Sequence, residues 1–331
     1  MMRQNLYTRG RRYFSVWILL LMLLATLDQN VEAMESFVDS GNYKILGNVP
    51  LNPQRIVSLD DLRITIPLLE LGIIPIGSHG RVNMKGNPYA RSGIVLTGKD
   101  FDNTDMVFLG SNPVDVEAIA VLKPDLILTL RNRPESITQL ALIAPTVVLD
   151  GAADDPFENY KVIAKLTNTK EEAMALERRY KYQIEQFKLA FKPERFTVSV
   201  ISGTSDGRIA LQHPYGTLGI VLQDAGFKFP PIFERIPDRR GVNVSIESLQ
   251  DLDADILIDT YRADRGEQPL TARNRLEAAF PKFCQFLSAC RNNRYFIIPR
   301  GEAKAISYQG KSIMIGFLTG VLSTMPTAPK D

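Results

Sequence analysis

VDVEAIAVLKPDLIL, residues 114–128, is followed 130 residues later by a similar stretch, VSIESLQDLDADILI, residues 244–258. Glu117 corresponds to Glu247 and Asp125 to Asp255, at the same offset in each copy. Each copy predicts a short helix, a turn and a buried strand. A repeat of this length is too long for a solenoid unit and suits two similar lobes.

The rest of the chain alternates in the same way. Apolar, β-branched runs predict strands at residues 55–59, 73–77 and 146–149 in the first half, and at 196–201 and 295–298 in the second. Helical patterns lie between them, and this alternation is typical of parallel sheets covered on both faces by helices. Residues 78–104, rich in Gly and Asn, predict a long surface loop.

A helical segment separates the two copies of the repeat. Between residues 157 and 192, apolar residues recur every three or four positions from Ala173 to Phe187, and Pro193 ends the pattern. The predicted architecture is therefore an N-terminal α/β lobe (residues 34–155), one long connecting helix (156–193) and a C-terminal α/β lobe (194–331).

The first 33 residues predict an export signal. Four arginines precede an apolar run from Val16 to Leu27, and small residues follow near Ala33, where a signal peptidase would cut. The run is short for a membrane-spanning helix, although an uncleaved anchor stays open. Arg11 and Arg12 resemble part of the twin-arginine motif, which leaves the export route open. No Cys follows the run, so lipid attachment there is not expected, and a periplasmic protein is.

Composition then excludes several partners. Removing the four arginines and two acidic residues of the signal from totals of 39 basic and 37 acidic leaves 35 of each. A net charge of zero argues against a general binder of nucleic acid or anionic membranes. The remaining 298 residues suffice for two domains with cores of their own.

The cysteines, Cys284 and Cys290, leave two alternatives. Export permits a disulfide, but positions six apart on one continuous helix point away from each other, so a bond requires a helix break. Two buried free thiols are the other alternative. With only two His in the chain, an iron–sulfur cluster is excluded and a structural zinc site is not expected.

Basic and aromatic residues follow the predicted strands. In open parallel sheets, ligands bind beyond the carboxyl ends of the strands, and arginine forks bind carboxylates and similar anionic oxygens in pairs of hydrogen bonds. The sequence thus predicts a cleft for an anionic, oxygen-rich ligand, with these candidate binding residues: Arg63, His79, Arg81, Arg131, Arg133, Arg208, Tyr215, Tyr261, Arg262 and Arg300.

Signals of catalysis are weak. The run from Ser202 to Ser205 lacks the nucleophile-elbow pattern, neither His lies in a metal-binding HExxH motif, and no phosphate-cradling Gly loop is present. Asp60 and Asp61 are better explained as helix caps than as a catalytic pair. We therefore expect no enzyme, with a periplasmic α/β enzyme as the rival class.

The chain resembles the periplasmic substrate-binding proteins for ferric siderophores, haem and vitamin B12 that serve ABC importers. The resemblance rests on PQRIVS (residues 53–58), LELGIIPIG (69–77), the first copy of the repeat and NNRYFIIP (292–299), and it spans about residues 50–325. It implies two α/β lobes bridged by one long helix, the class III binding-protein fold. It also implies that one glutamate per lobe, Glu117 and Glu247 here, docks onto arginines of the permease.

The resemblance implies a ferric siderophore as ligand. Iron would arrive already chelated, so no cofactor and no metal-coordinating side chain is expected, and the protein is expected to be a monomer. The hydroxamate-binding branch is nearest, but Ser111 and Asn112 replace its arginine before the Glu117 helix, and the part after the signal has no Trp. With the loop arginines, these departures favour a carboxylate-bearing or catecholate chelate. Haem or a corrinoid is the alternative, with Tyr215, Tyr261 and His79 as candidate axial ligands of haem.

Overall fold

The computed structural model describes residues 43–150, 155–204, 206–236 and 241–325. The predicted signal, residues 1–33, lies outside these ranges. Within them, no helix combines the length and apolar character needed to cross a membrane.

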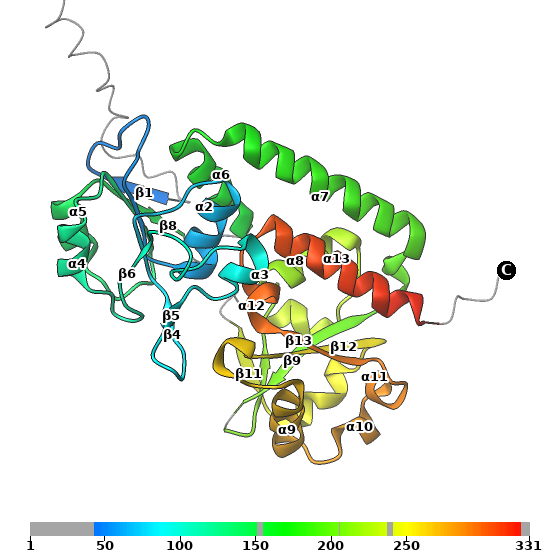
Figure 1. Ribbon diagram of the computed structural model, residues 1–331. Helices are drawn as coiled ribbons and strands as arrows, with labels where there is room; N and C mark the ends of the chain where they lie inside the picture. The colour runs from blue at the N-terminus through cyan, green and yellow to red at the C-terminus, as the bar shows by residue number, and fades with distance from the viewer. Residues whose placement is uncertain (1–42, 151–154, 205, 237–240, 326–331) are drawn as a thin grey trace, which may run out of the picture.

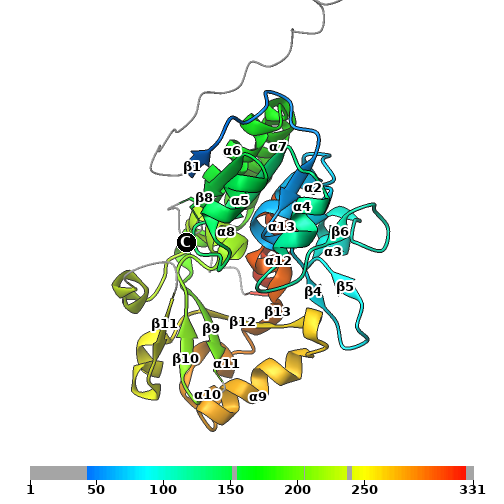
Figure 2. The ribbon, with the colours of Figure 1, turned by 90° about the vertical axis from the view of Figure 1, so that its left-hand side faces the viewer.

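Two sheets draw on separate halves of the chain (Figures 1 and 2). The N-terminal sheet has the order β1 (Tyr43–Leu46), β8 (Thr146–Leu149), β7 (Leu126–Leu130), β2 (Ile56–Ser58), β3 (Gly77–Ser78) and β6 (Val107–Phe108). All its neighbours are parallel except β1, which pairs antiparallel with β8. The predicted α/β class is therefore confirmed.

The C-terminal sheet is mixed. Its order is β11 (Val242–Val244), β10 (Ile209–Leu211), β9 (Val198–Gly203), β12 (Ile256–Tyr261) and β13 (Tyr295–Pro299). The three strands from β9 to β13 are parallel, whereas β10 is antiparallel to both of its neighbours. The buried strands β7, β9 and β12 are rich in Ile, Leu and Val because helices cover both of their faces.

Helices and short helical turns connect these strands. In the N-terminal half they are η1 (Asp61–Thr65), α2 (Ile66–Glu70), α3 (Gly93–Thr97), α4 (Val116–Val121) and α5 (Ile137–Ile143). In the C-terminal half they are η2 (Pro193–Arg195), α8 (Gly216–Ala225), η3 (Pro231–Arg235), η4 (Ile246–Leu252), η5 (Ala263–Arg265), α9 (Pro269–Ala279), α10 (Phe283–Phe286), α11 (Ser288–Arg291), α12 (Arg300–Lys304) and α13 (Tyr308–Ser323).

Two sequence predictions are corrected. The connecting segment is two helices, α6 (Pro156–Leu166) and α7 (Lys170–Phe191), because Asn168 adopts a left-handed φ of 57° and its side chain donates to the carbonyl of Leu51. The predicted loop 78–104 contains a hairpin of β4 (Arg81–Val82) and β5 (Pro88–Tyr89) as well as α3. The lobe boundaries at 33, 155 and 193 stay predictions.

The cysteines form a disulfide, so the alternative of two free thiols is wrong. The required helix break is present, because α10 ends at Phe286, Leu287 is extended and α11 begins at Ser288. The Cα atoms of Cys284 and Cys290 consequently lie 4.8 Å apart.

The closing helix α13 joins the two halves. Its N-terminus is seated on Glu70, at the end of α2, which accepts hydrogen bonds from Ser307 Oγ (2.7 Å) and from the backbone N–H groups of Tyr308 (2.9 Å) and Gln309 (2.8 Å). One turn further on, the ammonium of Lys311 lies 3.8 Å from the ring centre of Phe157 and 4.0 Å from that of Tyr180. Helix α13 therefore contacts α2, α6 and α7 through buried charged groups, and Figure 1 shows it running beside α7.

In each half of the chain, the aspartate of the repeat anchors the start of one strand to its neighbour. The Asp125 carboxylate accepts from the backbone N–H groups of Gln54 (2.7 Å) and Arg55 (2.9 Å), where the chain enters β2. Asp255 accepts from the N–H and hydroxyl of Thr197, both at 2.8 Å, where the chain enters β9. The two aspartates thus fix the start of β7 to β2 and of β12 to β9.

We predict that Asp125→Ala and Asp255→Ala each lower the free energy of unfolding by about 1–3 kcal/mol, because each removes two hydrogen bonds to a carboxylate. Chemical denaturation measures the effect. Asp105→Ala, at an exposed position, is the matched control and should stay within about 0.5 kcal/mol. An unchanged stability in both repeat variants would contradict this role.

Candidate functional site

A cationic cleft lies between the two sheets, beyond the carboxyl ends of β2 and β3 in one sheet and of β12 and β13 in the other. It encloses about 690 Å³, counted to its open mouth, and is lined from the N-terminal half by residues that follow β2 and β3, and from the C-terminal half by residues that follow β12 and β13. The lining residues are Asp60, Leu62, Arg63, Arg81, Arg91, Arg262, Asp264, Arg265, Arg300, Gly301 and Lys304.

Local structure explains how the C-terminal half supplies its charges. Arg262 follows the last residue of β12, and Arg300 follows the last residue of β13 as the first residue of α12. Lys304 comes four residues after Arg300, so both side chains lie on one face of α12. Gly216 permits this arrangement, because a Cβ there would lie 2.6 Å from the Cα of Lys304.

Lys304 is enclosed by neutral and basic groups. Its ammonium donates to Gln212 Oε1 at 2.5 Å and lies 4.8 Å from the ring centre of Tyr215. Burial, followed by the charges of Arg300, Arg63, Arg91 and Arg262, lowers the pKa of Lys304 to about 7. Burial and the charges of Arg300 and Arg265 also lower the pKa of Arg262. The basic side chains of the cleft therefore repel one another and are partly buried, which disfavours their charged forms.

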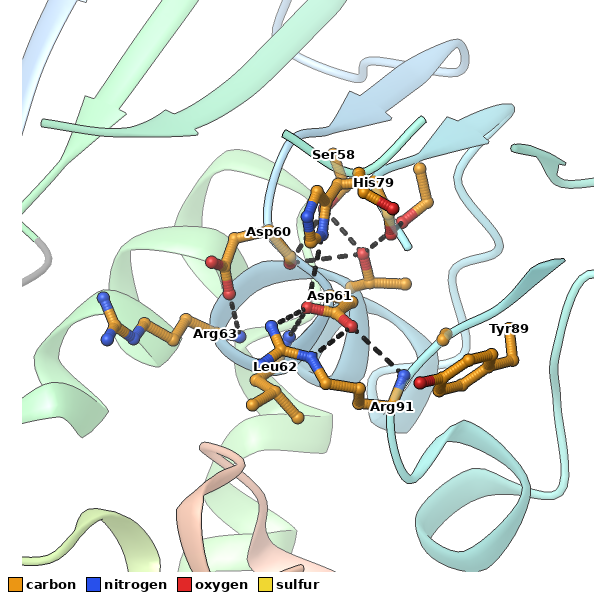
Figure 3. Close-up of polar contacts among 12 residues, drawn as sticks. Ser58, Asp60, Asp61, Leu62, Arg63, His79, Tyr89 and Arg91 are labelled. Atoms are coloured by element: carbon orange, nitrogen blue, oxygen red, sulfur yellow. Dashed lines mark hydrogen bonds and ion pairs between the residues drawn. The ribbon is translucent and has the colours of Figure 1, made fainter. Parts of the chain in front are cut away.

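The side chain of Arg91 is held by a buried carboxylate, that of Asp61 (Figure 3). Arg91 Nε donates to Asp61 Oδ2 at 2.8 Å, and its terminal nitrogen donates to Oδ1 at 2.5 Å. His79 Nδ1 lies 3.3 Å from the same Oδ1. Although burial raises it, the hydrogen bonds and charges of Arg91 and His79 hold the pKa of Asp61 well below its usual value. Asp61 thus stays ionised and fixes the Arg91 guanidinium at the cleft.

Four of the ten predicted residues come together in the cleft: Arg63, Arg81, Arg262 and Arg300. His79 does not, and its prediction as a ligand contact is wrong, because its side chain is fully buried beneath Asp61. Asp60 caps the helix as predicted by accepting from Arg63 N–H, but Asp61 does not, since it binds Arg91.

The other five predicted residues lie outside the cleft lining. Tyr215 is buried, with its hydroxyl 2.7 Å from Thr260 Oγ1, and supports Lys304 from below. Arg133 pairs with Glu135 at 3.1 Å and Arg208 with Asp206 at 2.6 Å. Arg131, exposed after β7, and Tyr261, the half-buried last residue of β12, complete this group.

The ten predicted residues leave out three basic residues of the cleft lining, Arg91, Arg265 and Lys304. Arg91 lies in the stretch that the sequence predicts to be an irregular loop. Asp100 fixes this stretch beside the cleft, because its carboxylate accepts hydrogen bonds from the N–H groups of Ala90 and Phe101. The signal for Lys304 was its spacing of four from Arg300 at the start of a helix.

The fold and the cleft together define a class: an α/β protein with a cationic cleft between two sheets. Residues 94–299 match the family described as periplasmic binding protein, and the chain belongs to this family. It is a family of substrate-binding proteins and not of enzymes.

Named relatives agree with this assignment. The chain is 31% identical over 268 residues to the probable siderophore-binding lipoprotein YfiY of Bacillus subtilis, covering 76% of this chain and 80% of that protein. The FhuD protein from S. pseudintermedius has a similar fold, with a TM-score of 0.70 at 21% identity over 90% of this chain and all of that one. Staphylococcus aureus SirA, complexed with staphyloferrin B, has a TM-score of 0.66 at 24% identity over 82% and 94%.

We predict that Lys304 titrates near pH 7 in the ligand-free protein, whereas exposed lysines titrate near about 10.4. Carbon-13 NMR of the lysine Cε atoms, followed against pH, measures it. Lys304→Arg removes the signal and so assigns it. A midpoint near 10 for the assigned signal would show that neither burial nor the arginine charges lower the pKa of Lys304.

Proposed function

We propose that this protein captures an anionic ferric siderophore in its cationic cleft and delivers it to an ABC importer for iron uptake. The observation that carries the proposal is the seven basic side chains that converge from both halves on one cleft with two acidic ones. Both acids already accept hydrogen bonds, Asp60 from Arg63 N–H and Asp264 from the Tyr89 hydroxyl. The YfiY relative, named as siderophore-binding, supports the same ligand type.

Iron in such a ligand is cargo rather than a cofactor. Among the described residues, no group of three or more His, Cys, Asp or Glu side chains is placed to hold a metal ion. The cleft instead offers guanidinium groups, which hydrogen-bond to the anionic oxygens of a chelate and do not coordinate iron.

Haem and corrinoid are poorer fits. Of the three candidate axial ligands for haem, His79 is buried beneath Asp61 and the Tyr215 hydroxyl bonds Thr260. A macrocycle also requires apolar walls, and among the described residues that line the cleft Leu62 supplies the one apolar side chain. An enzyme is less supported still, because the described residues that line the cleft form no nucleophile–base pair.

Delivery implies contact with a permease. Both glutamates of the repeat are exposed: Glu117 in the first turn of α4 and Glu247 at the start of η4. Each of these elements precedes the strand whose start is held by the aspartate of the repeat. We propose that these two glutamates dock onto the permease, that residues 1–33 direct export to the periplasm, and that the protein acts as a monomer.

Binding is tested by tyrosine-fluorescence titration of residues 34–331 with ferric, gallium and iron-free siderophores, haem and a corrinoid. We expect sub-micromolar binding of a ferric and gallium chelate and weak binding of haem and the corrinoid. Arg300→Met should weaken binding at least tenfold, since it removes a cleft cation, whereas Arg178→Met, exposed on α7, should not. Preference for haem, or no binding at all, would refute the proposal.

Docking is tested by combining Glu117→Ala with Glu247→Ala. We expect the affinity for the chelate to stay the same and iron uptake by cells that contain the importer to fall by at least tenfold. Glu172→Ala, exposed on α7, is the matched control. A loss of affinity in the double variant would instead place these glutamates at the ligand.

A further inference from the structure

The cleft is unusual in what it lacks as well as in its charge. Among the residues that the structure describes, eleven line the cleft, of which nine are ionic and none is aromatic. A chelate that binds here gains energy from guanidinium–oxygen contacts and little from stacking or apolar burial. This composition separates ligand classes within the proposed siderophore-binding function, on which the inference rests.

Ferric chelates differ in net charge and in surface. A tris-hydroxamate chelate is neutral or positive, so seven basic side chains offer it no net attraction. A tris-catecholate chelate is anionic but presents three aromatic rings, and among the described residues that line this cleft only Leu62 offers an apolar side chain to cover them. A chelate built from hydroxycarboxylates is anionic, presents mainly oxygen atoms and leaves the outer oxygens of its carboxylates at its surface, where guanidinium groups can donate hydrogen bonds to them.

Lys304 adds a second criterion. Its ammonium faces Gln212 and Tyr215 on one side, and its charged neighbours are Arg300 of the same helix, Arg63 of η1, Arg91 ahead of α3 and Arg262 after β12. Two acidic residues are close in sequence to these basic groups. Glu302 comes two positions before Lys304 on α12. Asp264, on η5, comes two positions after Arg262 and lines the cleft. Four guanidinium charges oppose the charge of the ammonium, and the contacts that favour it are Gln212 Oε1 and the Tyr215 ring. An anion that enters the cleft adds to this stabilisation.

We propose that the ligand is the ferric complex of a polycarboxylate siderophore of the hydroxycarboxylate type, and that Lys304 takes up a proton as this anion binds. Proton uptake couples affinity to ligand charge: a neutral chelate leaves Lys304 uncharged and gains nothing from it. Lys304 thereby selects for anionic chelates as well as binding them.

The sign of the pH dependence follows from this coupling. Below about pH 7, Lys304 is protonated before binding, so affinity does not depend on its titration. Above it, each binding event must first protonate Lys304, and affinity falls by up to about tenfold per pH unit until the pKa of the bound state is reached. Surface carboxylates of the ligand titrate well below this range and leave the trend unchanged.

Isothermal titration calorimetry tests the ligand class. The probes are ferric rhizoferrin, a polycarboxylate with two citrate units, ferrioxamine B, a tris-hydroxamate, and a ferric tris-catecholate, each at pH 6.5 and 8.5. We expect ferric rhizoferrin to bind at least 100-fold more tightly than the other two at pH 6.5. Tighter binding of the hydroxamate or the catecholate would overturn the class and leave siderophore capture standing, whereas no binding of any ferric chelate would remove the proposed function itself.

The role of Lys304 is tested with the same bound chelate. In the wild-type protein, affinity should fall at least tenfold between pH 6.5 and 8.5, and titrations in buffers of different ionisation enthalpy should report uptake of protons at pH 8. Lys304→Arg, which keeps the charge at both pH values, should abolish both effects while retaining tight binding; Lys304→Met should weaken binding at pH 6.5. An equal pH dependence in wild type and Lys304→Arg would overturn the role.

Discussion

The hydrogen bonds that Glu70 accepts at the N-terminus of α13 set the geometry on which the cleft depends. Glu70 belongs to the N-terminal half, whereas its three donors, which begin at Ser307, follow two residues after the end of α12, the helix that carries Arg300 and Lys304. A backbone hydrogen bond of 3.0 Å from Ile306 N–H to the carbonyl of Leu62 lies between these two points. Basic side chains from distant parts of the sequence therefore face one another because this junction fixes them there.

Gathering like charges opposes folding, and the structure limits this repulsion in two ways. Asp61, ionised under the cleft, neutralises Arg91 and holds it in a bidentate pair. Lys304 gives up charge, because burial and its arginine neighbours bring its pKa close to neutrality. An anion that enters the cleft relieves the remaining repulsion between the basic side chains. This relief contributes to the free energy of binding.

Much of this could be read from the sequence because it follows from periodicity. Alternating strands and helices predict parallel sheets, and the rule that ligands bind beyond strand ends places Arg63, Arg81, Arg262 and Arg300 at one cleft. The failures concern tertiary contacts. His79 follows a strand as the arginines do, yet its side chain is buried next to Asp61 and does not reach the cleft. Arg91 reaches the cleft through a turn pinned by Asp100, which no periodicity reveals. The disulfide required knowledge that Leu287 is extended.

The repeat links the fold to the proposed docking surface. Each repeat aspartate staples the start of its central strand to the neighbouring strand, which fixes the helical turns just before it. Glu117 and Glu247 lie on those turns, eight residues ahead of Asp125 and Asp255. The first copy forms an α-helix and the second a tighter 3₁₀ turn, so the repeat keeps the strand anchor while the helical geometry differs. The half-buried aspartates have a role within the fold as strand anchors, whereas both glutamates are exposed. Glu247 accepts a hydrogen bond from Ser245 Oγ at 2.7 Å. The exposed position that the two glutamates share is what the proposed docking to a permease rests on.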